Sequence, residues 1–395
     1  MKRSYKFRIY PDKEQEIVLK KTIGCCRYIY NWGLETRDAF WRKSGELMSF
    51  SQMGVLMTQL RKQPETEWLS EVSYTAMQQS LRNVNSAFMK FFKKKSQFPK
   101  FKKRKNGGSA RFTRDSFYLA DRVFRVNRVK GSIKVVWSRE LPSKPSSCVV
   151  SKNPSGQWFA SFTCEFEPEI LSKSKKKIGI DLGIETFATL SDGRKFKQPD
   201  SIRKNRRKLA RAQRNQDRKR IGSKNREKYC LKVAKIYQKT VNQRNDFLHK
   251  LSSQLIHENQ VIAIEDLAVS KMVKNRRLAR LIGEQGWREF RTMLEYKSNW
   301  YGRELIIIDR FSPTSQICNS CGKINKLTLD KRKFKCECGV TYDRDINAAQ
   351  NILAAGMVVS ACGANVRPIS NRQSATKQEN FGTCFGVNSM LEFEN

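Results

Sequence analysis

The sequence predicts a multidomain protein that combines α/β and α+β regions. The chain has 395 residues, which is enough for two or three domains with separate hydrophobic cores. Short strand candidates cluster between residues 110 and 166. Farther along, between 177 and 311, short apolar strands alternate with long helical segments. These two patterns indicate a β-rich unit followed by an α/β unit.

The first hundred residues read as one strand followed by helices. Residues 2–9 alternate polar and apolar side chains, which is typical of a strand with one buried face. Residues 12–42 carry apolar side chains at helical spacing, and two further helical stretches follow around 50–62 and 73–94. The composition then changes to a basic loop with Pro and Gly at 98–108.

The next segment predicts a small β-barrel. Alternating apolar residues and turn residues recur at short intervals between 110 and 166. We expect the strand at 2–9 to join this barrel, so that the helices are inserted between its first and second strands. Residues 168–177 look like a linker. The strand candidates are "ARFT", "RVFRVNRV", "SIKVVW", "SCVVSK" and "WFASFTCEFE".

The following segment alternates strands and helices. The stretch "KIGIDLGIETFATLSDGRKFKQP" predicts three short strands joined by turns. Residues 201–258 predict two long helices that are broken at 221–225. Buried strands are expected at 260–266 and 304–311, with the amphipathic helix "GWREFRTMLEYKSNWYG" between them.

The charge of the chain indicates a polyanionic partner. Lys and Arg total 78 and Asp and Glu total 37, which gives a net charge of +41. An excess of this size favours nucleic acid well ahead of a membrane surface. No run of 18 apolar residues predicts a transmembrane helix, and the start "MKRSYKFRIYPDKEQE" has no apolar signal-peptide core. We therefore expect a cytosolic protein.

One helical segment is basic enough to suggest direct contact with a nucleic-acid backbone. Ten basic residues and one acid lie between positions 203 and 220. A charge run is often only a solvated helix face, but this one is too one-sided for ion pairing along the helix. The residues predicted to contact phosphate are Arg203, Lys204, Arg206, Arg207 and Lys208.

Four cysteines have the spacing of a zinc site. Cys318 and Cys321 form C-x-x-C, Cys336 and Cys338 form C-x-C, and a glycine follows each pair. Four thiolates suit tetrahedral Zn²⁺, and with no open position the site would be structural. A redox pair is disfavoured because nothing resembling a βαβ unit surrounds Cys318. The other seven cysteines have no ligand spacing and are expected to be ordinary thiols: Cys25, Cys26, Cys148, Cys164, Cys230, Cys362 and Cys384.

Three acids are the candidates for catalysis. The chain has only two histidines, His249 and His257, which are too few for histidine-based hydrolysis. Asp181 ends the apolar run "KIGI", Glu265 ends "VIAI", and Asp345 starts a helix after the second cysteine pair. Three carboxylates from separate elements suit two Mg²⁺ ions about 3.5–4 Å apart, which would support phosphodiester cleavage.

Surface acids at strand ends are the alternative interpretation for each carboxylate alone, but it weakens when all three occur in this order. The neighbouring acids Glu185, Asp266 and Asp343 serve as comparisons. Strand alternation directs Asp266 to the face opposite Glu265.

Several motifs together resemble the TnpB family, transposon-encoded RNA-guided nucleases related to type V CRISPR effectors. The resemblance covers residues 1–356. It rests on "RYIYNWGLETR", "WLSEVSYTAMQQSLRN" and "FPKFKKRK" near the start. In the second half it rests on "IGIDLGIETFATLSDG", "VIAIEDLAV", "GWREFRTMLEYKSNWYGRELIIIDRFSPTSQICNSCG" and "CECGVTYDRDINAAQNI".

The resemblance implies a division into domains. It predicts a RuvC-like nuclease of RNase H fold at 171–310 and 340–356, with a zinc-ribbon insertion at 311–339. It also predicts a wedge β-barrel at 1–10 and 108–170, with a helical recognition domain inserted at 11–107. The polar tail at 357–395 is expected to be disordered. A zinc ion can substitute for the core that so small an insertion lacks, and the insertion can set where Asp345 points.

The implied activity is RNA-guided cleavage of DNA. A guide RNA from the transposon end would pair with one strand of double-stranded target DNA, and the protein would read a short adjacent motif. The family's catalytic acids fall on Asp181, Glu265 and Asp345, which would hold two Mg²⁺ ions. Readers of the adjacent motif are expected at Tyr74, Thr75 and Gln78.

The same resemblance implies a prokaryotic cytoplasmic protein associated with the nucleoid, in an element that can encode a separate transposase as a further partner. Three alternatives stay open at this stage. The first is an accessory transposition protein or a DNA-strand transposase, although the His-hydrophobe-His and catalytic Tyr arrangement of a single-strand transposase is missing. The second is a nuclease-inactive RNA-guided repressor, which the intact set of acids argues against. The third is a zinc-ribbon nucleic-acid-binding module without chemistry. Metal-dependent cleavage of a guided target would separate them.

Overall fold

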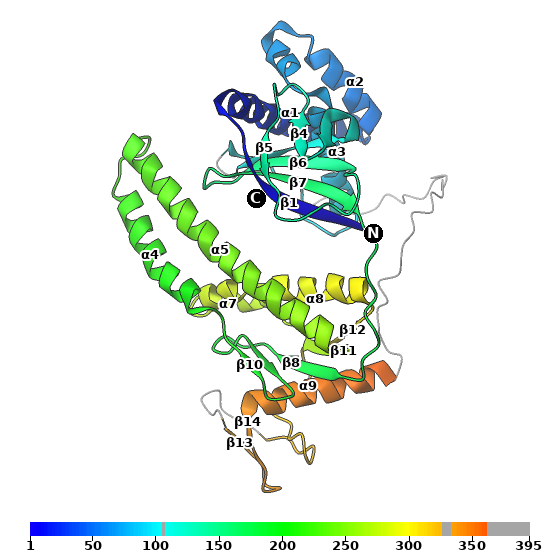
Figure 1. The fold of residues 1–395 in the computed structure, drawn as a ribbon, viewed down its shortest axis with the longest axis vertical. Coiled ribbons are helices and arrows are strands. Elements are labelled where there is room, and N and C mark those ends of the chain that lie inside the picture. Colours follow the sequence, from blue (N-terminus) through cyan, green and yellow to red (C-terminus); the bar gives the residue numbers. More distant parts are fainter. Residues whose placement is uncertain (105–106, 326–332, 362–395) are drawn as a thin grey trace.

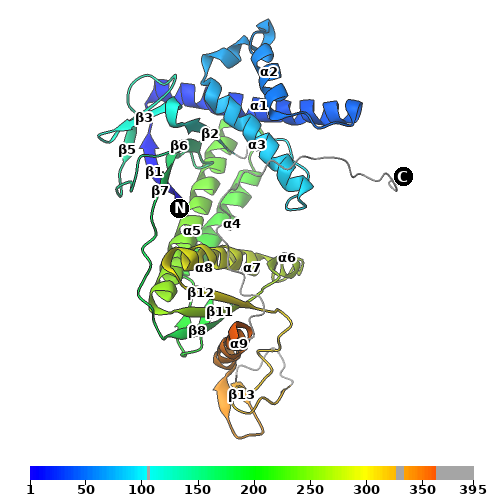
Figure 2. The same cartoon turned by 90° about the vertical axis from the view of Figure 1, so that its right-hand side faces the viewer.

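The computed structural model describes residues 1–104, 107–325 and 333–361. The protein contains two five-stranded sheets, and helices pack against each of them (Figure 1). The amino-terminal helices lie with the first sheet, and the long helices α4 and α5 extend from the second sheet toward the first (Figure 2). The chain is thus a mixed α/β protein, as the sequence predicts.

The amino-terminal helices form a compact group with its own core. Asp12 caps α1 by accepting a hydrogen bond from the Gln15 amide at 2.8 Å, and Gly45 ends the helix at a φ of 71°. Met53 and Met57 of α2 and Met77 and Leu81 of α3 pack against α1. A 3₁₀ helix at Pro64–Glu71 was not predicted. The bounds are α1 Lys13–Ser44, α2 Phe50–Leu60 and α3 Tyr74–Phe92.

The first sheet is antiparallel, with the strand order β2-β6-β7-β1-β5. The first strand pairs with β7 over eight residues, from Lys2 opposite Glu165 to Ile9 opposite Trp158. The expectation that this strand joins the later ones, with helices inserted between, is confirmed. The bounds are β1 Lys2–Tyr10, β2 Gly108–Thr113, β5 Lys134–Val136, β6 Ser147–Lys152 and β7 Trp158–Glu165.

The predicted closed barrel is not what these strands form. In the part of the chain that the structure describes, β2 and β5 are the two edges of the sheet and do not pair with each other. The intervening residues instead form a separate hairpin, β3 Phe117–Ala120 with β4 Val123–Val126. Phe124 of this hairpin packs on Phe162 of β7, so the hairpin covers the face of an open sheet.

The second sheet has the order β10-β9-β8-β11-β12, and its three central strands β8, β11 and β12 run parallel. These strands are almost wholly apolar because helices cover both of their faces. The predicted strand, turn, strand, turn, strand pattern is confirmed. The bounds are β8 Lys177–Asp181, β9 Ala188–Leu190, β10 Lys195–Phe196, β11 Val261–Glu265 and β12 Glu304–Ile308.

Alternation along β11 assigns its two faces. Ile262 and Ile264 pack with α5 and α8 on one face. Val261 and Ala263 pack with α9 on the other. The helices on the first face are α5 Lys224–Glu258, α6 Val269–Met272, α7 Ala279–Gln285 and α8 Trp287–Tyr301, and α4 Asp200–Asp217 packs on α5.

The last helix, α9, runs from Arg344 to Ala361. The expectation that the tail begins at 357 is therefore wrong for its first five residues. Met357 and Val359 pack against the sheet, so burial extends the helix past the predicted end. The rest of the predicted disordered tail, 362–395, lies outside the described residues.

We predict that Gly179→Ala in β8 lowers the free energy of unfolding by about 1–3 kcal/mol or more. A Cβ at this position would lie 2.1 Å from the Ala349 carbonyl oxygen of α9, so a backbone segment would have to shift. The matched control is Gly54→Ala in α2, where a Cβ meets nothing within 4 Å. The control should keep or slightly raise the thermal midpoint. Equal midpoints for both variants would contradict the close packing of α9 on β8.

Candidate active site

Three predicted carboxylates reach one edge of the second sheet. Asp181 ends β8 and Glu265 ends β11. The strands run parallel with Ile180 opposite Ile264, so the next residue of each strand comes to the same edge. Alternation places both carboxylates on the face that α9 covers, and Asp345 lies in the first turn of α9.

The start of α9 is held by a neighbouring acid. The Asp343 carboxylate accepts hydrogen bonds from the amides of Asp345, at 3.1 Å, and Ile346, at 3.3 Å. It also accepts one from the Lys195 ammonium group of β10 at 2.7 Å. Asp343 therefore caps the helix, which sets where Asp345 lies relative to the sheet.

Burial and mutual repulsion dominate the electrostatics of this edge, and the nearby Arg344 opposes them only in part. Burial and the nearby carboxylates of Glu265 and Asp345 raise the pKa of Asp181 to about 7. Burial also raises the pKa of Glu265, although a hydrogen bond from the Thr314 hydroxyl opposes the shift. A cation at this edge would relieve both effects.

Asp266, the residue after Glu265, lies between two arginines and not beside the other acids. Its carboxylate accepts hydrogen bonds from Arg291 of α8 and from Arg310, which follows β12. Burial would raise the pKa of Asp266, but these two arginines outweigh that effect and lower it. The residue after Glu265 thus faces the opposite side, as strand alternation predicts, and it is already neutralised.

The donor set at the sheet edge fits a hard divalent cation. All three side chains offer carboxylate oxygens, and burial beside two other acids raises the pKa of Asp181, which a bound cation would oppose. Among the described residues, the four cysteines are the one group of three or more such ligands whose atoms all lie within 4.8 Å of one another.

The four cysteines converge as their spacing predicts. The Cys318 and Cys338 sulfurs are 3.8 Å apart, and those of Cys321 and Cys336 are 3.5 Å apart. A tetrahedral zinc site with Zn–S bonds of about 2.3 Å has sulfur–sulfur edges of about 3.8 Å. Glycines with positive φ follow each pair, 73° at Gly322 and 85° at Gly339. The cluster therefore fits a zinc ion.

Side-chain amides tie the cysteine cluster to α9, and sequence reasoning missed them. Asn347 donates to the Ile317 carbonyl at 2.7 Å and accepts from the Asn319 amide at 3.0 Å. Asn351, one turn later, donates to the carbonyls of Thr314 and Ile317, each at 2.7 Å. The only sequence signal is the i, i+4 spacing of the two asparagines on one helix face. The same segment supplies the Thr314 hydroxyl that contacts Glu265.

The predicted phosphate-contacting residues lie on α4. Arg203, Lys204, Arg207 and Lys208 are exposed there. The fifth, Arg206, is half-buried and forms an ion pair with Glu284 of α7 at 3.7 Å. Arg206 therefore connects two helices, and the other four present exposed side chains that could meet a polyanion.

The predicted motif readers Tyr74, Thr75 and Gln78 lie at the start of α3. Tyr74 is 36% exposed, its ring stacks under the Arg61 guanidinium at 5.0 Å, and its hydroxyl is 3.4 Å from that of Thr58. Thr75 and Gln78 are half-buried. The three residues form an accessible corner between α2 and α3.

Among the described residues, the remaining thiols and the two histidines lie away from the cysteine cluster that fits zinc. Cys25, Cys26, Cys148 and Cys164 are buried, and Cys230 is exposed. Cys362 and Cys384 lie outside the described residues. Both histidines lie on α5. None of these described residues joins a group of metal-ligand type.

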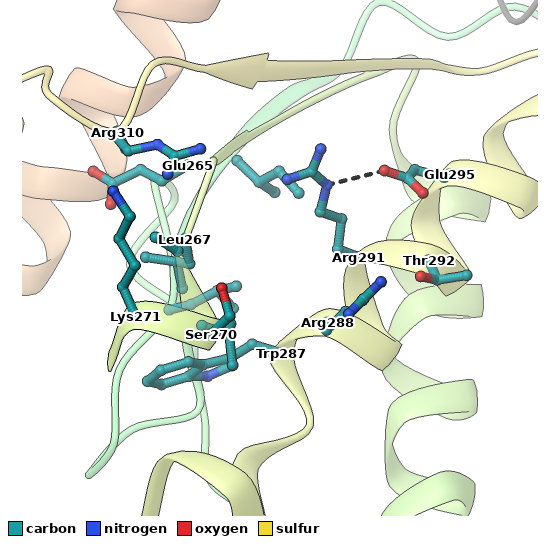
Figure 3. Close-up of a pocket in the computed structure, with 14 residues that line it drawn as sticks. Glu265, Leu267, Ser270, Lys271, Trp287, Arg288, Arg291, Thr292, Glu295 and Arg310 are labelled. Carbon is teal, nitrogen blue, oxygen red and sulfur yellow. Dashed lines mark hydrogen bonds and ion pairs between the residues drawn. The ribbon is translucent and has the colours of Figure 1, made fainter. Parts of the chain in front are cut away.

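A cavity lies beside Glu265, and sequence reasoning did not find it. It has a volume of about 420 Å³ and lies between the end of β11, helix α6 and helix α8 (Figure 3). Its charged lining residues are Glu265, Lys271, Arg288, Arg291, Glu295 and Arg310.

Three family models match the chain. The first, described as "Probable transposase", covers 161–276, and the second, described as "Cas12f1-like, TNB domain", covers 287–352. The third is described as a helix-turn-helix domain and covers 1–46. In this structure that last segment is a strand followed by one 32-residue helix.

Two relatives that match almost the whole chain show which family it belongs to. A protein of Streptomyces pristinaespiralis named RNA-guided DNA endonuclease is 43% identical over 96% of each chain. The chain belongs to the TnpB (IS605 OrfB) family. A second TnpB-type relative, the Escherichia coli K12 protein named RNA-guided DNA endonuclease InsQ, is 33% identical over 92% of this chain and 94% of its own.

A solved structure shares the fold of this TnpB protein. A chain from a structure titled as a Cas12f1, sgRNA and target DNA complex aligns with a TM-score of 0.54 at 14% identity. The alignment covers 89% of this chain and 98% of that one.

Among the described residues, no helix is long and apolar enough to cross a membrane.

Proposed function

We propose that this TnpB-family protein is an RNA-guided DNA endonuclease. The observation that carries the proposal is the 43% identity, over 96% of both chains, to a relative named as such an enzyme. Three carboxylates at one edge of a parallel sheet, in a chain of net charge +41, supply the chemistry and the nucleic-acid affinity that this activity needs.

In this proposal Asp181, Glu265 and Asp345 are the catalytic residues and hold two Mg²⁺ ions. Bound Mg²⁺ supplies an activated water and stabilises the leaving oxygen of the cut phosphodiester. Thr314 orients Glu265 through its hydroxyl hydrogen bond. Asp343 orients Asp345 by capping α9.

The domains proposed for these roles are those that the sequence suggests. Residues 171–310 and 340–356 act as a RuvC-like nuclease of RNase H type. The segment 311–339 binds one structural Zn²⁺ through Cys318, Cys321, Cys336 and Cys338. Residues 1–10 and 108–170 form the wedge domain, and 11–107 form the helical recognition domain.

The guide RNA and the target DNA are the proposed partners. A guide derived from the transposon end pairs with one DNA strand, and exposed cations on α4 contact nucleic-acid phosphates. Tyr74, Thr75 and Gln78 read a short motif beside the target. We further propose a prokaryotic cytoplasmic location at the nucleoid, and a separately encoded transposase of the same element as an additional partner.

We predict that the protein purifies with a bound RNA of roughly a hundred nucleotides or more, as a chain with so large a positive charge spread over its length should. Because phosphate neutralisation releases counterions, affinity for the stripped RNA should fall by at least about 10³-fold between roughly 50 and 200 mM salt. The measurement is filter binding across a salt series, with sequencing of the copurified RNA. Protein that elutes RNA-free at low salt and still cuts DNA would contradict a guide mechanism.

The activity itself is tested with a plasmid that carries a target matched to the sequenced RNA. The RNA-loaded protein should cut this plasmid in Mg²⁺ and leave it intact in chelator. A plasmid with a scrambled target is the control. A guided repressor or an accessory transposition protein would bind the matched plasmid and leave it uncut, which would overturn the proposal.

A further inference from the structure

The cavity beside Glu265 has the size and lining of a ligand site. Its volume of about 420 Å³ lies within the ~300–1,000 Å³ range of pockets that hold small organic molecules. Leu267 and Trp287 form apolar parts of its wall, and polar groups surround them. Figure 3 shows Glu265, Lys271 and Arg310 on one side and Arg288, Arg291 and Glu295 of α8 on the other.

Four cations line this cavity, but they differ in how far they are neutralised. Arg291 forms ion pairs with both Asp266 and Glu295, and Arg310 forms one with Asp266. These two arginines therefore already have carboxylate partners.

Lys271 and Arg288 have no such partner among the residues that the structure describes. Both side chains are exposed. In the described part of the chain neither side chain forms an ion pair or a hydrogen bond. Two unpaired cations on opposite walls of one cavity leave it ready to accept an anionic ligand.

We propose that this cavity holds one nucleotide of the DNA strand being cleaved, next to the scissile phosphodiester. Lys271 binds the phosphate nearer to Glu265, and Arg288 binds the phosphate on the far side of the same nucleotide. This inference rests on the proposed endonuclease function. It adds a subsite that positions the strand.

The location argues for the cleaved strand. Glu265 forms part of the cavity wall and also belongs to the proposed catalytic set. A strand that occupies the cavity therefore passes beside one of the three proposed catalytic carboxylates, Glu265. The apolar wall suits a sugar or base, and a guanidinium or ammonium group suits a phosphodiester oxygen. Both features match a nucleotide in a strand.

The binding test uses the guide-loaded protein in chelator and a short single-stranded DNA as the probe. Lys271→Ala with Arg288→Ala should weaken its affinity by roughly tenfold, as expected for two partly exposed charge contacts. Each substitution should also reduce the salt-dependence slope by about 0.7. Guide RNA loading and the thermal midpoint should stay unchanged. The matched control is Lys274→Ala, an exposed lysine nearby that does not line the cavity.

The position of each contact is tested with methylphosphonate substitutions in the target strand. Neutralising a phosphate beside the cleavage site should slow the wild-type enzyme. It should have no further effect in the variant that lacks the matching cation. Because the positive charge of residue 271 is what binds the phosphate, Lys271→Arg should retain most of the cleavage activity.

If each methylphosphonate slows the wild type, Lys271→Ala and Arg288→Ala equally, the inference is wrong. Cleavage by the wild-type enzyme in the same experiment would still support the endonuclease function. Failure of the wild-type enzyme to cut any guide-matched DNA would instead overturn both.

Discussion

Asp181→Ala is expected to abolish DNA cleavage, by at least roughly 10³-fold, and to leave guide loading and target binding close to wild type. Asp181 is half-buried at the end of β8, and its charge interacts with Glu265 and Asp345. Removing it takes away one of the three carboxylates that would hold the metal. Loss of one negative charge cannot weaken phosphate attraction, so binding should survive.

The measurement pairs plasmid cutting with a binding assay on the same samples, with Mg²⁺ and with chelator. Asp246→Ala is a matched control, because this exposed aspartate of α5 forms an ion pair with Lys250 one turn away and belongs to no proposed site. The control should cut like wild type. Double variants among the three acids should lose no more than the single ones, since one loss already empties the site. Robust Mg²⁺-dependent cutting by Asp181→Ala would refute the assignment.

The same residue predicts an effect of pH on the metal-free protein. An acid whose pKa rises from about 3.9 in the unfolded chain to about 7 in the fold keeps its proton longer when folded. The free energy of unfolding should therefore fall as pH rises from about 4 to about 7. In chelator, the midpoint of Asp181→Ala relative to wild type should be higher at pH 8 than at pH 4. A constant difference would show that burial and the neighbouring acids do not raise the pKa of Asp181 in the folded protein.

Local patterns in the sequence predicted which acids end the strands and which cysteines lie together. Apolar runs that end in an acid located Asp181 and Glu265, and alternation separated Glu265 from Asp266. The cysteine spacing predicted a cluster whose sulfurs do converge. In each case the deciding geometry spans only a few residues, so it is visible without the fold.

The features that sequence reasoning missed depend on contacts between distant segments. Thr314 reaches Glu265 across 49 positions, and Asn351 reaches Thr314 across 37. The cavity between β11 and α8 is set by helix packing, which leaves no periodic signal. The predicted barrel failed for a similar reason, because strand composition does not reveal whether β2 and β5 pair or a hairpin intervenes.

Cys318→Ser is expected to reduce bound zinc from one ion per chain to almost none, and to lower the thermal midpoint. The segment holding the cysteines has a small core, in which Phe334 packs with Cys318 and Cys336. A segment of this kind depends on its metal for folding. Cys336→Ser should behave in the same way, because the four thiolates form one site.

Cleavage should fall as well, by roughly 10–100-fold, which is the usual cost of losing groups that orient metal ligands. Contacts between the cysteine segment and the proposed catalytic acids explain why losing zinc should reduce cleavage. The cysteine segment is bound to α9 through Asn347 and Asn351, and it also presents Thr314 to Glu265. When the segment unfolds, Asp345 and Glu265 lose their supports together.

The matched control for this prediction is Cys230→Ser, which removes an exposed thiol on α5 that has no metal-type neighbours among the described residues. It should retain zinc, stability and cutting. Elemental analysis, thermal unfolding and plasmid cleavage on the same preparations provide the three readouts. Normal cutting by a zinc-free Cys318→Ser protein would separate the cluster from the active site. That result would mean that α9 and Asp343 suffice to place Asp345 without the metal.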